Sequence, residues 1–164
     1  MINKRGNTLY IGLKPHVSYS KIDFEVQVTM PRLKGLDASG ASDVKVSGFK
    51  SDDDLSIGLS GASELNGFVH VGNLNIELSG ASEVELIGSG NKLTIDGSGA
   101  SELDLGDFKV ESANIELSGA SEVEVHAVES ISADLSGSSE VKYHGNPRMK
   151  DIDTSGASEI SSVN

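Results

Sequence analysis

"LSGASEVEL" occupies residues 78–86, and close variants of this phrase return along the chain. The phrase is SGAS (SGSS once) followed by an acid. Its copies begin at Ser39, Ser60, Ser79, Ser98, Ser118, Ser136 and Ser155. Successive copies lie 18 to 21 residues apart, which is too short for a paired-helix repeat. The spacing predicts one small unit repeated seven times.

The residues around each phrase alternate between aliphatic and polar. Leu74, Ile76 and Leu78 precede one copy, and Val84 and Leu86 follow it. Alternation with a period of two is typical of strands with one buried face. Each unit is therefore predicted to be a strand, a corner and a second strand.

A unit of this size cannot enclose a core alone, so the coils must stack. An aliphatic residue stands three places before the first Ser of every copy and another stands five places after it. The two rows are Leu36, Ile57, Ile76, Ile95, Ile115, Ala133 and Ile152, and Val44, Leu65, Val84, Leu103, Val123, Val141 and Ile160. We predict an all-β fold: a right-handed, single-stranded parallel β-helix (β-solenoid) of about seven to eight coils with a ~19-residue repeat.

The glycine of each phrase is predicted to form the turn, because glycine adopts positive φ without a Cβ clash. The turn glycines are Gly40, Gly61, Gly80, Gly99, Gly119, Gly137 and Gly156. The second Ser of each phrase has the parity of the inward aliphatics. We expect its hydroxyl to face inward and to bond nearby backbone or a neighbouring hydroxyl.

The whole chain, residues 1–164, is interpreted as one domain, with residues 39–164 forming the seven repeats. Residues 1–38 are expected to form an irregular opening coil that covers the first edge, with strands at 8–13 and 22–30 and Pro31 ending the second. The last repeat is expected to leave a strand edge uncovered, which predicts end-to-end self-association.

The net charge of −12 argues against nucleic acid and anionic membrane surfaces as partners, because like charges repel. No apolar run is long enough for a membrane span, and the first ten residues lack the apolar middle of a signal peptide. The chain has no cysteine, which excludes disulfides and thiolate metal sites.

Two rows of acids flank the corner on the outward face. They are Asp43, Glu64, Glu83, Glu102, Glu122, Glu140 and Glu159, and Asp37, Glu77, Asp96, Glu116, Asp134 and Asp153, the second row broken at Gly58. One hypothesis is a Ca²⁺ ladder, since carboxylates on adjacent coils are the hard oxygens that Ca²⁺ prefers. Its candidate ligands are Glu64, Glu83, Glu102, Glu122, Glu77, Asp96 and Glu116. The interpretation we favour is a solvated face that keeps the protein soluble, with no cofactor.

Other candidate sites have simpler explanations. His126 and His144 stand at equivalent positions, and with Glu129 nearby they resemble a transition-metal site, but a shared surface row is favoured. The serines recur as equivalent members of rows, so no catalytic residue is predicted. Phe49, Phe68 and Phe108 are expected to close the ends of the core. Two aromatic side chains exposed side by side would instead favour glycan binding.

The recurring SGAS[ED]V, the stretch TMPRLKGLDASGASDV (29–44) and the stretch VKYHGNPRMKDIDTSGASEI (141–160) resemble the family named "putative auto-transporter adhesin, head GIN domain". The resemblance extends over nearly the whole chain from about residue 7. It implies a right-handed parallel β-helix on exported, often lipid-anchored, bacterial surface or periplasmic proteins. It supplies no catalytic motif.

Three functions follow for testing. The first is a non-catalytic, extracytoplasmic, adhesin-like module that binds a glycan or a surface protein. The second is a polysaccharide-active, pectinase- or lyase-like enzyme, which predicts a break in the rows with a cleft that holds two or three acids and an Arg or Lys. The third is a structural spacer or assembly unit, which predicts end-to-end contacts.

Overall fold

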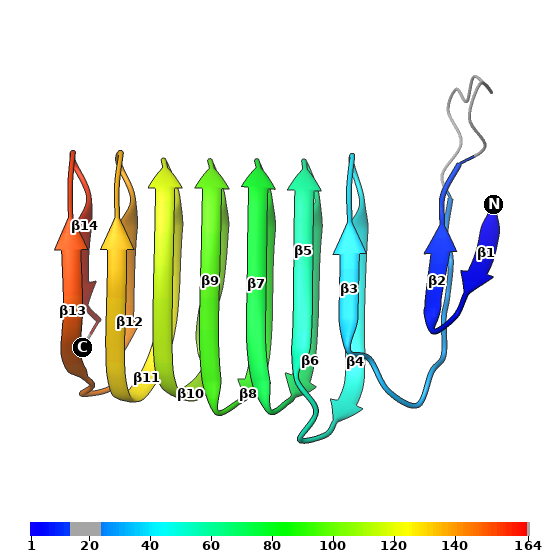
Figure 1. The fold of residues 1–164 in the computed structure, drawn as a ribbon, viewed down its shortest axis with the longest axis horizontal. Coiled ribbons are helices and arrows are strands. Elements are labelled where there is room, and N and C mark those ends of the chain that lie inside the picture. Colours follow the sequence, from blue (N-terminus) through cyan, green and yellow to red (C-terminus); the bar gives the residue numbers. More distant parts are fainter. Residues whose placement is uncertain (14–23, 164) are drawn as a thin grey trace.

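A computed structural model describes residues 1–13 and 24–163. From Gly35 onward the chain forms one 12-stranded sheet in which every pairing is parallel. The sheet is wound into seven coils that follow one another along a rod (Figure 1). The described residues contain no helix. The predicted β-solenoid is confirmed.

The rod has two broad faces. The front face in Figure 1 is made by β3 (Gly35–Ala38), β5 (Leu55–Gly61), β7 (Asn73–Gly80), β9 (Lys92–Gly99), the second halves of β10 (Glu102–Gly119) and β11 (Glu122–Leu135), and β13 (Arg148–Thr154). The back face is made by β4 (Asp43–Lys50), β6 (Glu64–His70), β8 (Glu83–Ser89), the first halves of β10 and β11, β12 (Glu140–His144) and β14 (Glu159–Ser162).

The winding is right-handed. In Figure 1 the front strands run upward, the chain returns downward behind them, and each coil lies one step further to the left. This is the hand expected of crossovers between parallel strands, because twisted strands connect favourably in that sense.

The register sets each residue over its counterpart in the next coil, as the spacing predicts. Ile57 pairs with Ile76 and Ile76 with Ile95 on the front face, while Leu65 pairs with Val84 on the back face. These side chains are almost fully buried between the two faces. Burying stacked aliphatic rows is the main stabilising contribution, at about 25 cal/mol for each Å² of apolar surface removed from water.

The corner is a second continuous row. The backbone N–H of Ala81 donates to the carbonyl of Gly61 in the preceding coil (2.8 Å), and the later phrases repeat this bond. The second serine is buried in the second to the sixth of the seven phrases. The Ser63 hydroxyl, for example, donates to the Ser60 carbonyl (3.0 Å). The expectation that these hydroxyls face inward and bond nearby backbone is confirmed, although the buried Ser101 Oγ has no partner among the described residues.

The N-terminal segment differs from the predicted opening coil. β1 (Ile2–Arg5) and β2 (Thr8–Ile11) form a separate antiparallel hairpin, and residues 24–30 contain no strand; residues 22–23 lie outside the described part. The physical reason is the two-residue Gly6-Asn7 loop, with Gly6 at φ +59°, because a loop this short joins antiparallel strands only. No described strand pairs with the outer edges of β3 and β4, although Leu33 packs against the core. The cover of the first edge stays a prediction.

Candidate functional site

The two predicted acid rows lie where the spacing places them. Glu83 pairs with Glu102, and Glu102 with Glu122, along the back face. On the front face Glu77 pairs with Asp96, while Gly58 interrupts the row beside it. Carboxylates about 5 Å apart repel by roughly 1 kcal/mol in water, and burial would raise that figure. The rows therefore lower stability unless salt or bound cations screen them.

Lys142 stands among the acids of the back face and is paired with two of them. Its ammonium donates to Glu122 (2.5 Å) and lies 3.4 Å from Glu140, and the Glu122 hydrogen bond raises the pKa of Lys142 above its usual value. The stabilising contribution of this pair is present below the ordinary lysine pKa and is lost as the pH rises through the raised value. The pKa of Asp53 is shifted in the opposite direction, because the hydrogen bond from Lys34 (2.9 Å) lowers it. The stabilising contribution of the Asp53–Lys34 pair is therefore lost as the pH falls through the lowered pKa.

Replacing one acid in the middle of the back row should stabilise the protein. We expect Glu102→Gln to raise the free energy of unfolding by ~0.5 kcal/mol at low salt, because the carboxylate stands between two others. The gain should vanish at high salt, where the repulsion is screened. Urea unfolding in calcium-free buffer at both salt concentrations measures this.

The matched control is Glu122→Gln, which removes the nearest partner of Lys142 and should lower stability instead. Equal losses in both variants would contradict a repulsive row. Among the residues that the structure describes, no group of three or more His, Asp or Glu side chains is arranged to hold a metal ion. The Ca²⁺ ladder stays an untested hypothesis beside the favoured solvated face, and titration calorimetry with Ca²⁺ is its direct test.

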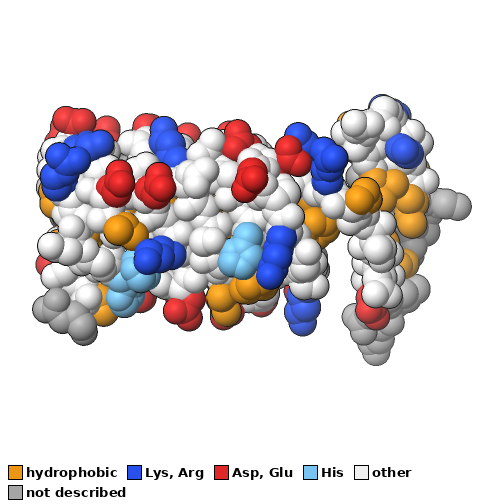
Figure 2. Space-filling model, turned by 90° about the horizontal axis from the view of Figure 1, so that it is seen from below, with side chains coloured by type: hydrophobic (Ala, Val, Ile, Leu, Met, Phe, Trp, Pro, Cys, Tyr) orange, Lys and Arg blue, Asp and Glu red, His pale blue; other side chains and the backbone are white. Residues whose placement is uncertain are grey.

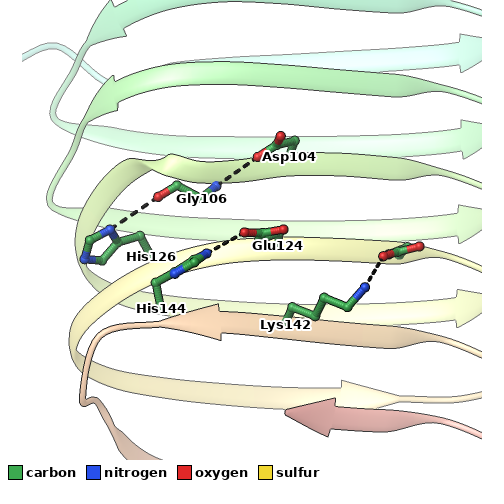
Figure 3. Close-up of polar contacts among 7 residues, drawn as sticks. Asp104, Gly106, Glu124, His126, Lys142 and His144 are labelled. Atoms are coloured by element: carbon green, nitrogen blue, oxygen red, sulfur yellow. Dashed lines mark hydrogen bonds and ion pairs between the residues drawn. The ribbon is translucent and has the colours of Figure 1, made fainter. Parts of the chain in front are cut away.

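The two histidines are neighbours, as predicted. His126 and His144 are partners across β11 and β12, with ring centroids 5.9 Å apart. Figure 3 shows His144 Nε2 directed at the Glu124 carboxylate and His126 Nδ1 directed at the Gly106 carbonyl (3.3 Å). The acid beside the pair is therefore Glu124 and not the expected Glu129.

Gly106 leaves room for this pair. A Cβ at Gly106 would lie 2.9 Å from a Glu124 oxygen and 3.3 Å from His144 Nε2. The site thus holds a hydrogen-bonded pair of His144 and Glu124, and a second imidazole, that of His126, hydrogen-bonded to a backbone carbonyl.

The phenylalanines do not share one role. Phe108 is fully buried and Phe49 packs against the core, as expected, but Phe68 is 40% exposed. Phe68 is the direct partner of Ile87, itself 43% exposed, on the next coil. Of these three aromatic side chains only one is exposed, so the pair of exposed rings that would mark a glycan platform is not formed by them.

Lys50 and His70 contact the Phe68 ring. The Lys50 ammonium lies 6.0 Å from the centre of the Phe68 ring, and His70 meets the ring edge-on with a centroid distance of 4.9 Å. We call Phe68, Ile87, Lys50 and His70 the Phe68 patch. Figure 2 shows hydrophobic side chains beside histidine and basic side chains on the face seen from below. The patch is a local exception on a strongly acidic chain.

Two shallow hollows lie on the outer surface. The first surrounds the break in the front row and includes Asp37, Gly58, Glu77 and Asp96 but no Arg or Lys. A Cβ at Gly58 would lie 2.7 Å from an Asp37 oxygen, so the missing side chain gives that carboxylate its room. The second hollow lies at the C-terminal coil and is lined by acids, among them Glu116 and Asp134, together with Lys150.

The stacked coils, buried aliphatic rows and repeated corner define a parallel β-helix repeat protein. The chain belongs to the family described as "Putative auto-transporter adhesin, head GIN domain", whose model matches residues 1–147. The predicted resemblance is confirmed.

A solved structure has the same fold. The crystal structure of a "Putative lipid binding protein" from Parabacteroides distasonis ATCC 8503 superposes with a TM-score of 0.66 at 21% sequence identity. The match covers 80% of this chain and 62% of that chain, so this chain spans less than two thirds of its length. No functionally curated protein matches this chain. The described part of the chain contains no helix long and apolar enough to cross a bilayer.

Proposed function

We propose that this chain is a non-catalytic, extracytoplasmic, adhesin-like binding module that contacts an anionic glycan through the Phe68 patch. The exposed Phe68 ring carries the proposal. An aromatic face packs against the C–H groups of a sugar. Lys50 beside it supplies positive charge, and Lys50 and His70 both offer hydrogen bonds. Family membership supports the adhesin-like role and the extracytoplasmic location.

The repetition of the chain supports a binding role over catalysis. A catalytic serine needs a base and an environment of its own, but the serines of the SGAS phrases occur as equivalent members of rows. Ser89 lies outside these rows, and its hydroxyl is 2.8 Å from His70 Nδ1. The break at Gly58 gathers acids without the basic residue that a polysaccharide-cleaving site needs. The second hollow does place Lys150 beside acids, and it is the specific place where the enzyme alternative can be tested.

Uronic-acid oligosaccharides are the probe for the proposal, first on a glycan array and then by titration calorimetry. We expect Phe68→Ala to weaken binding by about tenfold, the size of one aromatic contact. Val128→Ala is the matched control, because Val128 is similarly exposed (44%) and lies outside the Phe68 patch. It should leave affinity unchanged.

Three outcomes overturn the proposal. The first is an array without bound glycan, and the second is an equal loss of affinity in Phe68→Ala and Val128→Ala. The third is cleavage of the oligosaccharides, followed by their change in chain length. Cleavage that Lys150→Ala abolishes would establish the enzyme instead.

A further inference from the structure

A row of basic and hydrogen-bonding side chains runs along the rod on the back face, at the end of the strands away from the SGAS corners. The register places its members over one another from coil to coil, about 4.8 Å apart. They are Lys50, His70, Ser89, Lys109 and His126. We call these five residues the Lys109 row. Figure 2 shows basic and histidine side chains following one another along the face seen from below.

The side chains of the Lys109 row are available to a ligand. Lys50 and Lys109 are exposed, and neither takes part in an ion pair within the described part of the chain. The half-buried imidazoles are held in place through one ring nitrogen each: His70 Nδ1 by the Ser89 hydroxyl and His126 Nδ1 by a backbone carbonyl. The other ring nitrogen of each has no hydrogen bond to the described residues. Ordered groups of this kind lose little entropy when a ligand binds.

The row lies apart from the acid row of the back face. Glu83 and Ser89 are the first and last residues of β8, and six residues of strand separate their side chains by ~20 Å. This is more than twice the Debye length of about 8 Å at physiological salt, so the charge of Glu83 is screened at Ser89. The row ends at the partner of His126, His144, because that imidazole is directed at Glu124.

The composition of the row favours one kind of polyanion. Lys50 and Lys109 supply positive charge, while the other three members offer imidazole and hydroxyl groups. A uronic-acid chain likewise combines carboxylates with many neutral hydroxyls. Nucleic acid carries a phosphate on every nucleotide and needs more cations along its length. Figure 2 shows acidic side chains on both sides of the row, and these repel the more densely charged polymer.

We propose that a linear uronic-acid chain lies along the Lys109 row, parallel to the rod, with about one sugar on each coil. The proposal rests on the proposed function, because Lys50 and His70 belong to both the row and the Phe68 patch. Lys50 and Lys109 are three coils apart, or about 14 Å. A disaccharide at the Phe68 patch therefore does not reach Lys109, whereas a hexasaccharide does.

Calorimetry with β-1,4-linked mannuronate oligosaccharides tests the row, with the disaccharide measured by competition. We expect the hexasaccharide to bind about tenfold more tightly than the disaccharide, because it contacts several coils at once. Lys109→Ala should raise the hexasaccharide dissociation constant about fivefold and leave that of the disaccharide unchanged. Phe68→Ala should weaken both. Lys109→Arg should retain hexasaccharide binding.

The matched control is Lys45→Ala. Lys45 is exposed on β4, the strand of Lys50, but lies outside the Lys109 row, so its removal should change neither affinity. Because Lys45 and Lys109 are both exposed, circular dichroism and melting temperature should match those of the parent chain in both variants.

The outcomes separate this inference from the proposed function. Hexasaccharide binding that Phe68→Ala weakens and Lys109→Ala does not would overturn the row and leave the Phe68 patch standing. Equal losses in Lys45→Ala and Lys109→Ala would also overturn the row. Oligosaccharides that do not bind at all would overturn both proposals. A single-stranded oligonucleotide of six nucleotides that binds as tightly as the hexasaccharide would overturn the glycan as the occupant.

Discussion

Gly119→Ala is expected to lower the free energy of unfolding by about 2–5 kcal/mol. Gly119 has φ +103°, a conformation that costs an L-residue about 1–2 kcal/mol. A Cβ there would also lie 2.3 Å from the carbonyl oxygen of Gly99, in the preceding coil. Relieving that clash must shift a backbone that is itself hydrogen-bonded to its neighbours, at a further cost of about 1–3 kcal/mol. Urea unfolding measures the loss.

Gly40→Ala separates the cost of the positive φ from the cost of the clash with the neighbouring coil. Gly40 occupies the same place in the first phrase and has φ +82°, but none of the described residues lies within 4 Å of its Cβ position. We expect a loss of about 1–2 kcal/mol, from backbone conformation alone. Equal losses at Gly40 and Gly119 would show that stacking of coils does not require glycine.

Phe108→Ala is expected to destabilise the protein by about 3–5 kcal/mol, the range for removing a fully buried ring. The Phe108 ring lies close to the backbone of the neighbouring coil, since a Cβ at Gly90 would touch it at 3.5 Å. The backbone cannot collapse easily into the space left, because each coil is held in register by its ladder bonds. The loss should appear as a lower midpoint of urea unfolding.

Phe68→Ala is the control of the same residue type. Its ring is 40% exposed, so truncation should change the unfolding free energy by less than about 0.5 kcal/mol. A comparable loss in the two variants would mean that exposure does not distinguish their roles.

The stacking of the coils could be predicted because the sequence repeats at one spacing. Once Ile76 is placed over Ile57, the positions of Glu77, Gly80 and Glu83 follow from strand geometry alone. The turn glycines were predictable for the same reason, since a positive φ recurs wherever the corner recurs. Such predictions depend on the backbone, which the repeat determines.

The N-terminal hairpin was missed although its signal is in the sequence. Gly6-Asn7 between two short strands is a two-residue hairpin loop, and the prediction of a solenoid coil overrode it. The exposed Phe68 was missed for a different reason. Whether the ring of Phe49, Phe68 or Phe108 enters the core depends on local register shifts, such as the one between Asp104 and Phe108.

The side-chain contacts at the candidate site could not be predicted from the spacing of the repeat either. The spacing places His126 beside His144, but it does not show that His144 turns toward Glu124 or that Lys142 reaches Glu122 and Glu140. Rotamers decide these contacts, and several acids lie within reach of each cation.

The backbone bonds from each corner to the one before it have a consequence for how the rod opens. Each inner coil is hydrogen-bonded to two neighbouring coils, whereas each terminal coil is hydrogen-bonded to one. Amide hydrogen exchange should then form a gradient, fastest in the terminal strands and slowest near β9 and β10. Fraying from the ends would leave the middle of the rod intact as the last structure to be lost.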